Sequence, residues 1–235
     1  MERSVFHWAC VFALGAGPLV GCTDVVQTVM LTVTTTEAPS FDAEFSRGPL
    51  LEGVELCETD TTNCATTDAT GAAQIELPAN QAVSYTVSKD GYGPYLVGDV
   101  TDETFRASTW PMLSDALLAD NAAALGIEYP WTGGAIALNV FPSKAGVTFD
   151  LVVPDETAKR YYVDEAGEGT GLDLTETTLW GRGAFVELSP GEHEVEFGGN
   201  ATNCIPALAW PGGAANRITV PVRVGYISSS SMKCD

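Results

Sequence analysis

Basic residues are scarce in this sequence. Its 235 residues include 11 Lys and Arg against 31 Asp and Glu, which gives a formal net charge of -20. A surface of this sign repels the phosphates of nucleic acids and of anionic lipids. Nucleic acid is therefore not expected as a partner, and any membrane attachment must come from something other than a basic face. The acidity is typical of a soluble surface, with calcium binding by acidic loops as the alternative.

Histidine and the common catalytic motifs are equally scarce. His193 is the one histidine outside the first 21 residues, and serine-type catalysis needs a base held beside the nucleophile. Alternation places His193 on the same strand face as Val195 and Phe197, which favours a half-buried structural histidine. The sequence also lacks a Gly-x-Ser-x-Gly elbow and a nucleotide-binding glycine loop. We expect a non-enzymatic protein without cofactor or metal; a hydrolase with an unrecognised site is the remote alternative.

The apolar run at the start of the chain is too short to cross a membrane as a helix. It covers residues 5–14, follows Glu2 and Arg3, and is followed by small residues and Pro18. This placement is typical of a signal peptide, which predicts that residues 1–21 are removed. The next motif, Leu19-Val20-Gly21-Cys22, resembles the lipobox of bacterial lipoproteins.

The lipobox resemblance implies a lipid anchor. It implies that a diacylglyceryl group is attached to Cys22, that the chain is cut just before this residue, and that acyl chains such as palmitate tether residues 22–27 to a membrane. Each buried methylene contributes about 0.8 kcal/mol, so several acyl chains anchor stably. Thr23 follows the cysteine, and resemblance to the sorting habit of enteric bacteria implies the outer membrane. The side of the membrane that the protein faces stays open.

Helix-forming segments are rare after the signal peptide, whereas Thr, Val, Gly and Pro are plentiful. Period-two alternation and intervening turn residues predict short strands. A helix is expected over 114–125, with Ser114 as its N-cap, Asp115 in its first turn and Gly126 at its end. The expected strands are 25–36, 53–57, 73–77, 83–88, 135–141, 147–153, 184–188, 192–197 and 218–227, the last one an edge strand because it contains Pro221.

Two stretches of the chain repeat one pattern, which favours two modules. Residues 71–78 and 183–190 each read as a glycine, an alternating strand that ends in leucine, and a turn that contains proline. The first stretch, together with the strand 53–57, the turn 64–71 and Lys89-Asp90-Gly91-Tyr92, resembles the carboxypeptidase regulatory-like domain. That resemblance covers residues 28–105 and implies a transthyretin-like β-sandwich without catalytic residues.

The expected fold is all-β. It comprises two tandem prealbumin-like or Ig-like β-sandwich modules joined by a short helix and preceded by the lipoprotein signal peptide. Residues 28–105 form the first module, 106–132 a helical linker, and 133–235 a second, more divergent β-sandwich. A fold of this kind does not assign a function by itself.

Four cysteines remain once Cys10 is removed with the signal peptide and Cys22 is used for lipid. An even number in an exported chain predicts two disulfides, and four cysteines permit three pairings. We choose Cys57 with Cys64 and Cys204 with Cys234, because each pair then lies within one module. Zinc is the rival use of four cysteines, but the sequence has no Cys-x-x-Cys pair to support it.

Aromatic residues give the best indication of binding. Exposed aromatic side chains bind sugars and protein partners, although aromatic residues also fill cores and domain junctions. We therefore expect a non-catalytic envelope lipoprotein that binds a protein or glycan through β-sandwich loops, with a structural spacer or complex subunit as the alternative. The candidate contacts are Trp110, Tyr129, Trp131, Trp180 and Trp210.

Overall fold

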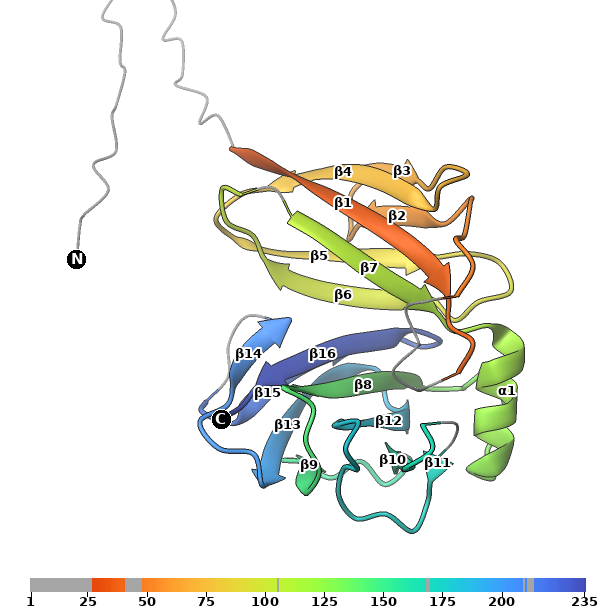
Figure 1. Cartoon of the computed structure of the whole chain (residues 1–235), viewed down its shortest axis with the longest axis vertical. Coiled ribbons are helices and arrows are strands. Elements are labelled where there is room, and N and C mark those ends of the chain that lie inside the picture. Colours follow the sequence, from red (N-terminus) through yellow and green to blue (C-terminus); the bar gives the residue numbers. More distant parts are fainter. Residues whose placement is uncertain (1–26, 41–47, 105, 168–169, 209, 211–213) are drawn as a thin grey trace, which may run out of the picture.

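The computed structural model describes residues 27–40, 48–104, 106–167, 170–208, 210 and 214–235. These residues form two β-sandwich modules and one helix, α1 (Asp115–Ala124), which links the modules in the chain (Figure 1). The chain is therefore an all-β protein with a short connecting helix. The strands are β1 (Thr28–Glu37), β2 (Glu55–Glu58), β3 (Cys64–Thr66), β4 (Ala72–Pro78), β5 (Ala82–Ser88), β6 (Tyr95–Val100), β7 (Arg106–Met112), β8 (Gly134–Phe141), β9 (Val147–Leu151), β10 (Lys159–Val163), β11 (Thr170–Gly171), β12 (Arg182–Leu188), β13 (Gly191–Gly199), β14 (Ile205–Leu208), β15 (Arg217–Val222) and β16 (Ile227–Lys233).

One hydrogen-bonded sheet runs through both modules. Its strand order is β11-β10-β12-β8-β16-β6-β5-β2-β3, and β14 pairs with β16. β16 is the last strand of the chain, yet it lies between β8 and β6 and runs parallel to both. In this ladder Ile227 is opposite Ala135 on one side and Tyr95 on the other. The backbone hydrogen bonds therefore continue from the first module into the second, and we call this layer the shared sheet.

Each module covers a different face of the shared sheet. Successive residues of a strand point to opposite faces, whereas residues in register on neighbouring strands point the same way. Tyr95, Ile227 and Ala135 therefore share a face, and in the first module the sheet β4-β1-β7 packs against it. Ile136 and Phe185 point the other way, and in the second module the sheet β15-β13-β9 packs on them. The two covering sheets consequently lie on opposite sides of one layer.

The connecting helix forms where the sequence predicts it. The Ser114 side chain accepts a hydrogen bond from the Leu117 amide at 3.3 Å, and Asp115 lies in the first turn. Gly126 has a φ of 69°, the left-handed conformation that ends many helices. Leu118 and Asn121 point inward and are buried. The helix thereby covers one end of the shared sheet in the second module.

The prediction of a single strand over 218–227 is wrong in the length of the strand. The segment forms two strands, β15 and β16, which belong to different sheets and are separated by a turn that includes Gly225 at a φ of 76°. The part predicted as an edge strand is confirmed: β15 is the outer strand of its sheet, where Pro221 lies opposite Glu192. Alternation does not predict β16, because the four consecutive serines at its centre show no apolar period.

The segment 106–132 is helical only in part. Its first seven residues form β7, which pairs in parallel with β1 and completes the covering sheet of the first module. Trp110 and Met112 are buried there. Pro111 interrupts the alternation expected of a strand, but β7 is the outer strand of its sheet, where a missing N–H is tolerated.

The disulfide pairing predicted from the sequence is confirmed. Cys57 is bonded to Cys64 across the β2–β3 ladder, and Cys204 is bonded to Cys234 at the C-terminus. Each bond lies within one module. All four thiols are used in these bonds, so none of these four cysteines is free to bind zinc.

Trp210 closes the junction between the modules on the side of the second core. It is 7% exposed and lies on Gly98 of β6, where an added Cβ would collide with the indole ring. Its Nε1 donates to the carbonyl oxygen of Ser229 at 3.3 Å. A residue of the second module thus packs on a strand of the first and joins it to β16.

Replacement of this side chain tests the importance of the junction. We expect Trp210→Ala to lower the free energy of unfolding by about 3–5 kcal/mol, because it leaves a cavity between β6 and β16. Urea unfolding measures this loss. Leu179→Ala is the control, since Leu179 is 79% exposed and surface changes stay within about 0.5 kcal/mol. Equal effects of the two variants would contradict the assigned role of Trp210.

Candidate ligand-binding groove

The shared sheet carries small side chains on one face of the second module and large ones on the other. On β8 the small residues Ala135 and Ala137 alternate with Ile136 and Leu138. Across the ladder, Ala184 of β12 is opposite Ala137, while its neighbour Phe185 is opposite Ile136. The large residues pack against β15-β13-β9. The face with the small residues is left hollow.

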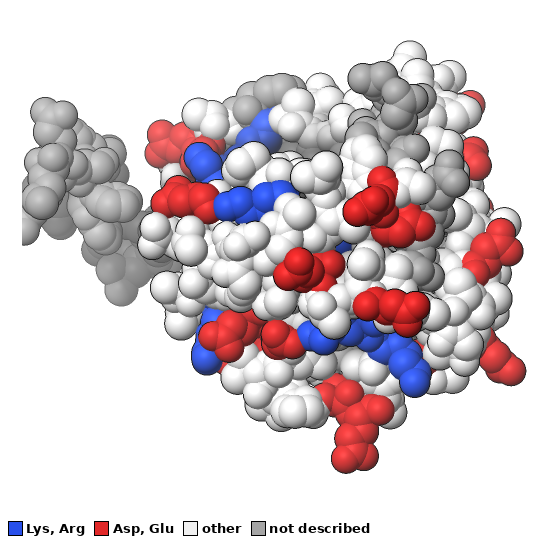
Figure 2. Space-filling view, turned by 60° about the horizontal axis from the view of Figure 1, so that its bottom comes forward, with Lys and Arg blue, Asp and Glu red and all other residues white. Residues whose placement is uncertain are grey.

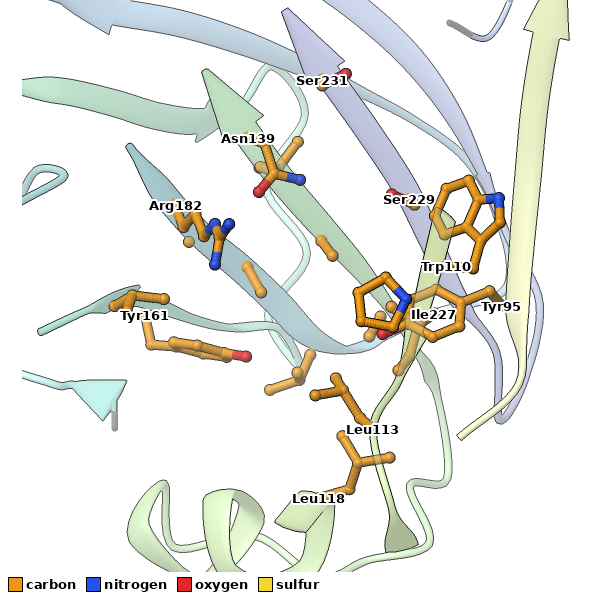
Figure 3. A pocket seen from close by; sticks show the side chains of 18 of the residues that line it. Tyr95, Trp110, Leu113, Leu118, Asn139, Tyr161, Arg182, Ile227, Ser229 and Ser231 are labelled. Carbon is orange, nitrogen blue, oxygen red and sulfur yellow. The ribbon is translucent and has the colours of Figure 1, made fainter. Parts of the chain in front are cut away.

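This hollow is a groove of about 410 Å³. Its floor is the small-residue face of β8, β12 and β16, and its walls are β7, the outer strand of the first module's covering sheet, and the start of α1 (Figure 3). Pockets for small ligands have volumes of roughly 300–1,000 Å³ and lie preferentially between domains. We call this the inter-module groove.

Polarity changes along the floor of the groove. Arg182, Asn139 and Ser231 are in register on β12, β8 and β16, so they form one polar row across three adjacent strands. Towards the other end, Ala135 and Ile227 replace them. Figure 3 shows the polar row at one end and the helix at the other. The residues at the apolar end are Tyr95, Leu113, Leu118, Trp131 and Ile227.

Arg182 is the one charged residue among the described residues that line the groove. These lining residues include no Asp or Glu, although the chain has 31 of them and Figure 2 shows many on the outer surface. Burial raises the pKa of Tyr95 and of Tyr161 above the usual range, so both phenols stay neutral. Apart from Arg182, the described residues of the lining are therefore uncharged.

Two aromatic residues hold the helix against the groove. The Asn121 side chain lies beside the Tyr161 hydroxyl, and the Tyr129 hydroxyl donates to Asp115 at 2.7 Å. Trp131 packs edge-on against Tyr129 with ring centroids 5.3 Å apart. Its buried Nε1–H faces no acceptor among the described residues, and its side chain lines the groove. Buried donors in proteins are normally satisfied, so a ligand atom or a water is expected there.

The aromatic residues selected from the sequence are largely buried, and their predicted role as loop contacts stays a prediction. Trp110 and Trp131 are both 6% exposed and line the groove, and the Nε1 of Trp110 donates to Tyr85 at 3.2 Å. Trp180 is half-buried and donates to the Glu165 carbonyl oxygen at 3.1 Å. Trp210 packs on the opposite face of the shared sheet, in the core of the second module. Five further residues line the groove that the sequence patterns do not single out: Arg182, Asn139, Ser231, Tyr95 and Tyr161. The alternation of Ala with large residues on β8 is the local signal for this site.

His193 shows no catalytic arrangement. As expected it is half-buried on the same face as Val195 and Phe197, and its Nε2 lies 2.8 Å from the backbone carbonyl oxygen of Ser189. Within the described residues, the one cluster of potential metal ligands is Glu55 with Cys57 and Cys64, whose sulfurs form a disulfide. These side chains therefore support neither nucleophilic catalysis nor a metal centre.

The acidic loop residues of the first module are held by a basic side chain. Arg106 contacts Asp99 at 2.8 Å and Asp102 at 3.2 Å. Hydrogen bonds from the hydroxyl and amide of Thr104, with further help from Arg106, lower the pKa of Asp102 to about 2. Asp99, Asp102 and Arg106 thus form an ion-pair network.

The expected lipid attachment site, Cys22, also lies outside the described residues. None of the helices in the described part of the chain has the length and apolar character needed to cross a membrane.

No family model and no curated protein matches this sequence, so membership of the carboxypeptidase regulatory-like family stays a prediction. Among solved structures, a type II cohesin–X-dockerin complex from Acetivibrio cellulolyticus is 17% identical with a TM-score of 0.28; the match covers 37% of this chain and 57% of that chain. The minor pilin GBS52 of Streptococcus agalactiae is 14% identical with a TM-score of 0.26, and the match covers 88% of this chain and 96% of the pilin. A family 26 carbohydrate-binding module of Eubacterium rectale Amy13K, solved with maltoheptaose, is 13% identical with a TM-score of 0.26. That match covers 86% of this chain and 93% of the module. This chain therefore spans little more than half of the first of these proteins, and TM-scores this low carry no argument about function.

The contact between Tyr161 and Asn121 can be tested by mutation. We expect Tyr161→Phe to lower the free energy of unfolding by about 1–3 kcal/mol, because it removes the hydroxyl beside the buried Asn121 side chain. The double variant Tyr161→Phe/Asn121→Leu should regain part of the loss in urea unfolding. A double variant that is less stable than the single one would show that this contact does not hold the helix.

Proposed function

We propose that this chain is a non-catalytic binding protein of the bacterial envelope, anchored by lipid on Cys22, that holds a small molecule with an apolar body in the inter-module groove. The observation that supports ligand binding in the groove is that small residues occupy only the groove side of the shared sheet. Ala137 and Ala184 leave the floor open, while the large residues beside them fill the core on the other face. Protein interiors are otherwise packed to crystal density.

The composition of the groove favours a small ligand over a glycan. Sugar recognition uses exposed aromatic rings, but Trp110 and Trp131 are each only 6% exposed. The central floor consists largely of Ala135, Ala137, Ala184 and Ile227, whose side chains offer no hydrogen bonds to hydroxyl groups; Ser229 adds one hydroxyl to it. A compact apolar body fits this floor, and its polar atoms would meet the polar row and the indole N–H of Trp131.

A structural spacer is the second candidate, and the shared sheet is the observation that favours it. Because β16 pairs with strands of both modules, the modules are held as one rigid body. Rigidity suits a spacer, but it also fixes the walls of a binding groove. The groove has no role in a spacer, so ligand binding is the better explanation of the residues that line it.

The membrane anchor is tested by removing its attachment site. We expect Cys22→Ser to abolish incorporation of labelled palmitate and to move the protein from the outer-membrane fraction to the soluble fraction, because no other residue carries the acyl chains. The four disulfide-forming cysteines stay in place in this variant, so its folding is unaffected. Labelling that persists in Cys22→Ser would overturn the proposed anchor.

The groove is tested with the neutral fluorophore N-phenylnaphthylamine. We expect the purified protein to bind it with enhanced emission and Ala137→Phe to abolish the binding, because the added ring fills the floor. Ala119→Phe, on the exposed side of α1, is the matched control and should bind normally. Ala184→Met serves as a second groove-filling variant. Unchanged binding by a folded groove-filling variant would refute the site.

A further inference from the structure

The indole N–H of Trp131 is the exception among the tryptophans that the structure describes. Trp110, Trp180 and Trp210 each donate from Nε1 to an oxygen of the protein, at distances of 3.1–3.3 Å. The Nε1 of Trp131 is buried and has no acceptor among the described residues. Buried donors in native proteins are nearly always satisfied, so this one needs an explanation.

Burial alone does not account for the exception. Trp110 and Trp131 are both 6% exposed and both line the inter-module groove, yet within the described residues only Trp110 has an acceptor, the Tyr85 hydroxyl. The other buried side-chain atoms without a partner in this part of the chain are hydroxyl oxygens, and their residues are not among those that line the groove. Trp131 is therefore the place where an unused donor and the groove coincide.

Trp131 is held in position from both sides along the chain. Its ring packs edge-on against Tyr129, whose hydroxyl donates to Asp115 at the start of α1 at 2.7 Å. On the other side, the Glu187 carboxylate accepts hydrogen bonds from the amide and the hydroxyl of Thr132 at 3.2 and 2.8 Å. A donor that is fixed before a ligand arrives loses little conformational freedom on binding, which favours affinity.

The surroundings of Trp131 favour a neutral acceptor. Leu113, Leu118 and Ile227 line the groove and belong with Trp131 to one apolar cluster. Transfer of a charged group into apolar surroundings costs far more than a single hydrogen bond returns. A carbonyl oxygen, an ether oxygen or an aromatic ring nitrogen is neutral and is stabilised by one donor. An acceptor of this kind satisfies the indole N–H while the rest of the molecule stays in contact with apolar side chains.

We infer that the ligand of the inter-module groove is a neutral, largely apolar molecule with a hydrogen-bond acceptor, and that the Nε1 of Trp131 donates to this acceptor. The inference rests on the proposed function, since it specifies the ligand of the same groove. Ketones, esters and aromatic nitrogen heterocycles belong to this class. Trp131 is then the residue that distinguishes such a molecule from a hydrocarbon of the same shape.

Two ligands of the same shape test the inference on the purified protein. Acetylnaphthalene and isopropenylnaphthalene, substituted at the same ring position, differ in that a carbonyl oxygen replaces a methylene group. The affinity of each is measured by displacement of N-phenylnaphthylamine. We expect Trp131→Phe to lower the affinity for the ketone about fivefold relative to that for the alkene, because it keeps an aromatic ring and removes the donor.

Trp110→Phe is the matched control. Trp110 has the same exposure and lines the same groove, but its N–H is already used by Tyr85. Both affinities change together if this variant alters the groove, so the ratio of the ketone and alkene affinities should stay that of the wild-type protein. A fivefold fall in the ratio for Trp110→Phe as well would overturn the assignment to Trp131.

NMR of the indole N–H groups gives a second readout that requires no variant. We expect one indole proton of the wild-type protein to lie further downfield with the ketone than with the alkene, because a hydrogen bond to the carbonyl oxygen deshields it. This resonance should be missing from Trp131→Phe and present in Trp110→Phe. An N–H that points at the Tyr129 ring would instead stay upfield with both ligands, and that result would overturn the inference.

The outcomes separate the inference from the proposed function. If N-phenylnaphthylamine does not bind, or if a folded Ala137→Phe variant binds it as the wild type does, the proposed function is wrong and the inference falls with it. If the fluorophore binds in the groove but the ketone does not displace it, the groove stands and the acceptor is refuted. An affinity ratio that is unchanged in Trp131→Phe also refutes it. Should Trp131→Phe fail to fold, the indole resonances of the wild-type protein still decide.

Discussion

The arrangement of this protein depends on the alternation of side chains along the shared sheet. Because β16 is parallel to both β6 and β8, side chains in register on the three strands are forced to the same side. The first module buries that side and the second module buries the other. Two cores therefore form on opposite sides of one layer, and part of the layer in the second module is left for the helix and the groove to occupy.

The groove is the part of this layer where packing is incomplete. The residues that would close it, such as a leucine at position 137 or 184, would each bury apolar area and add to stability. The protein has alanine at both positions. Reduced packing of this kind is characteristic of a site that receives a ligand, because the missing volume can be filled from outside.

Some elements of this structure can be predicted from the sequence and others cannot. β5 alternates Val83, Tyr85 and Val87 with polar residues and was predicted closely, and the ends of α1 follow from Ser114 and Gly126. The same local signals are absent from β16, whose serines are buried only because strands flank it on both sides. Arg182 likewise has no local signal. Its place in the groove emerges only when β12, β8 and β16 are set in register, which is a property of tertiary pairing.

The position of β16 also bears on how the chain reaches its folded state. Ile227 pairs with Tyr95 across more than half of the sequence, and contacts between such distant segments form slowly. Until residues 227–233 are available, β6 and β8 each keep an unpaired edge, and open edges are templates for aggregation. Pairing with β16 therefore removes both open edges. A chain cut before β16 would keep the unpaired edges of β6 and β8, even if all its other strands had formed, and would be prone to aggregate through them.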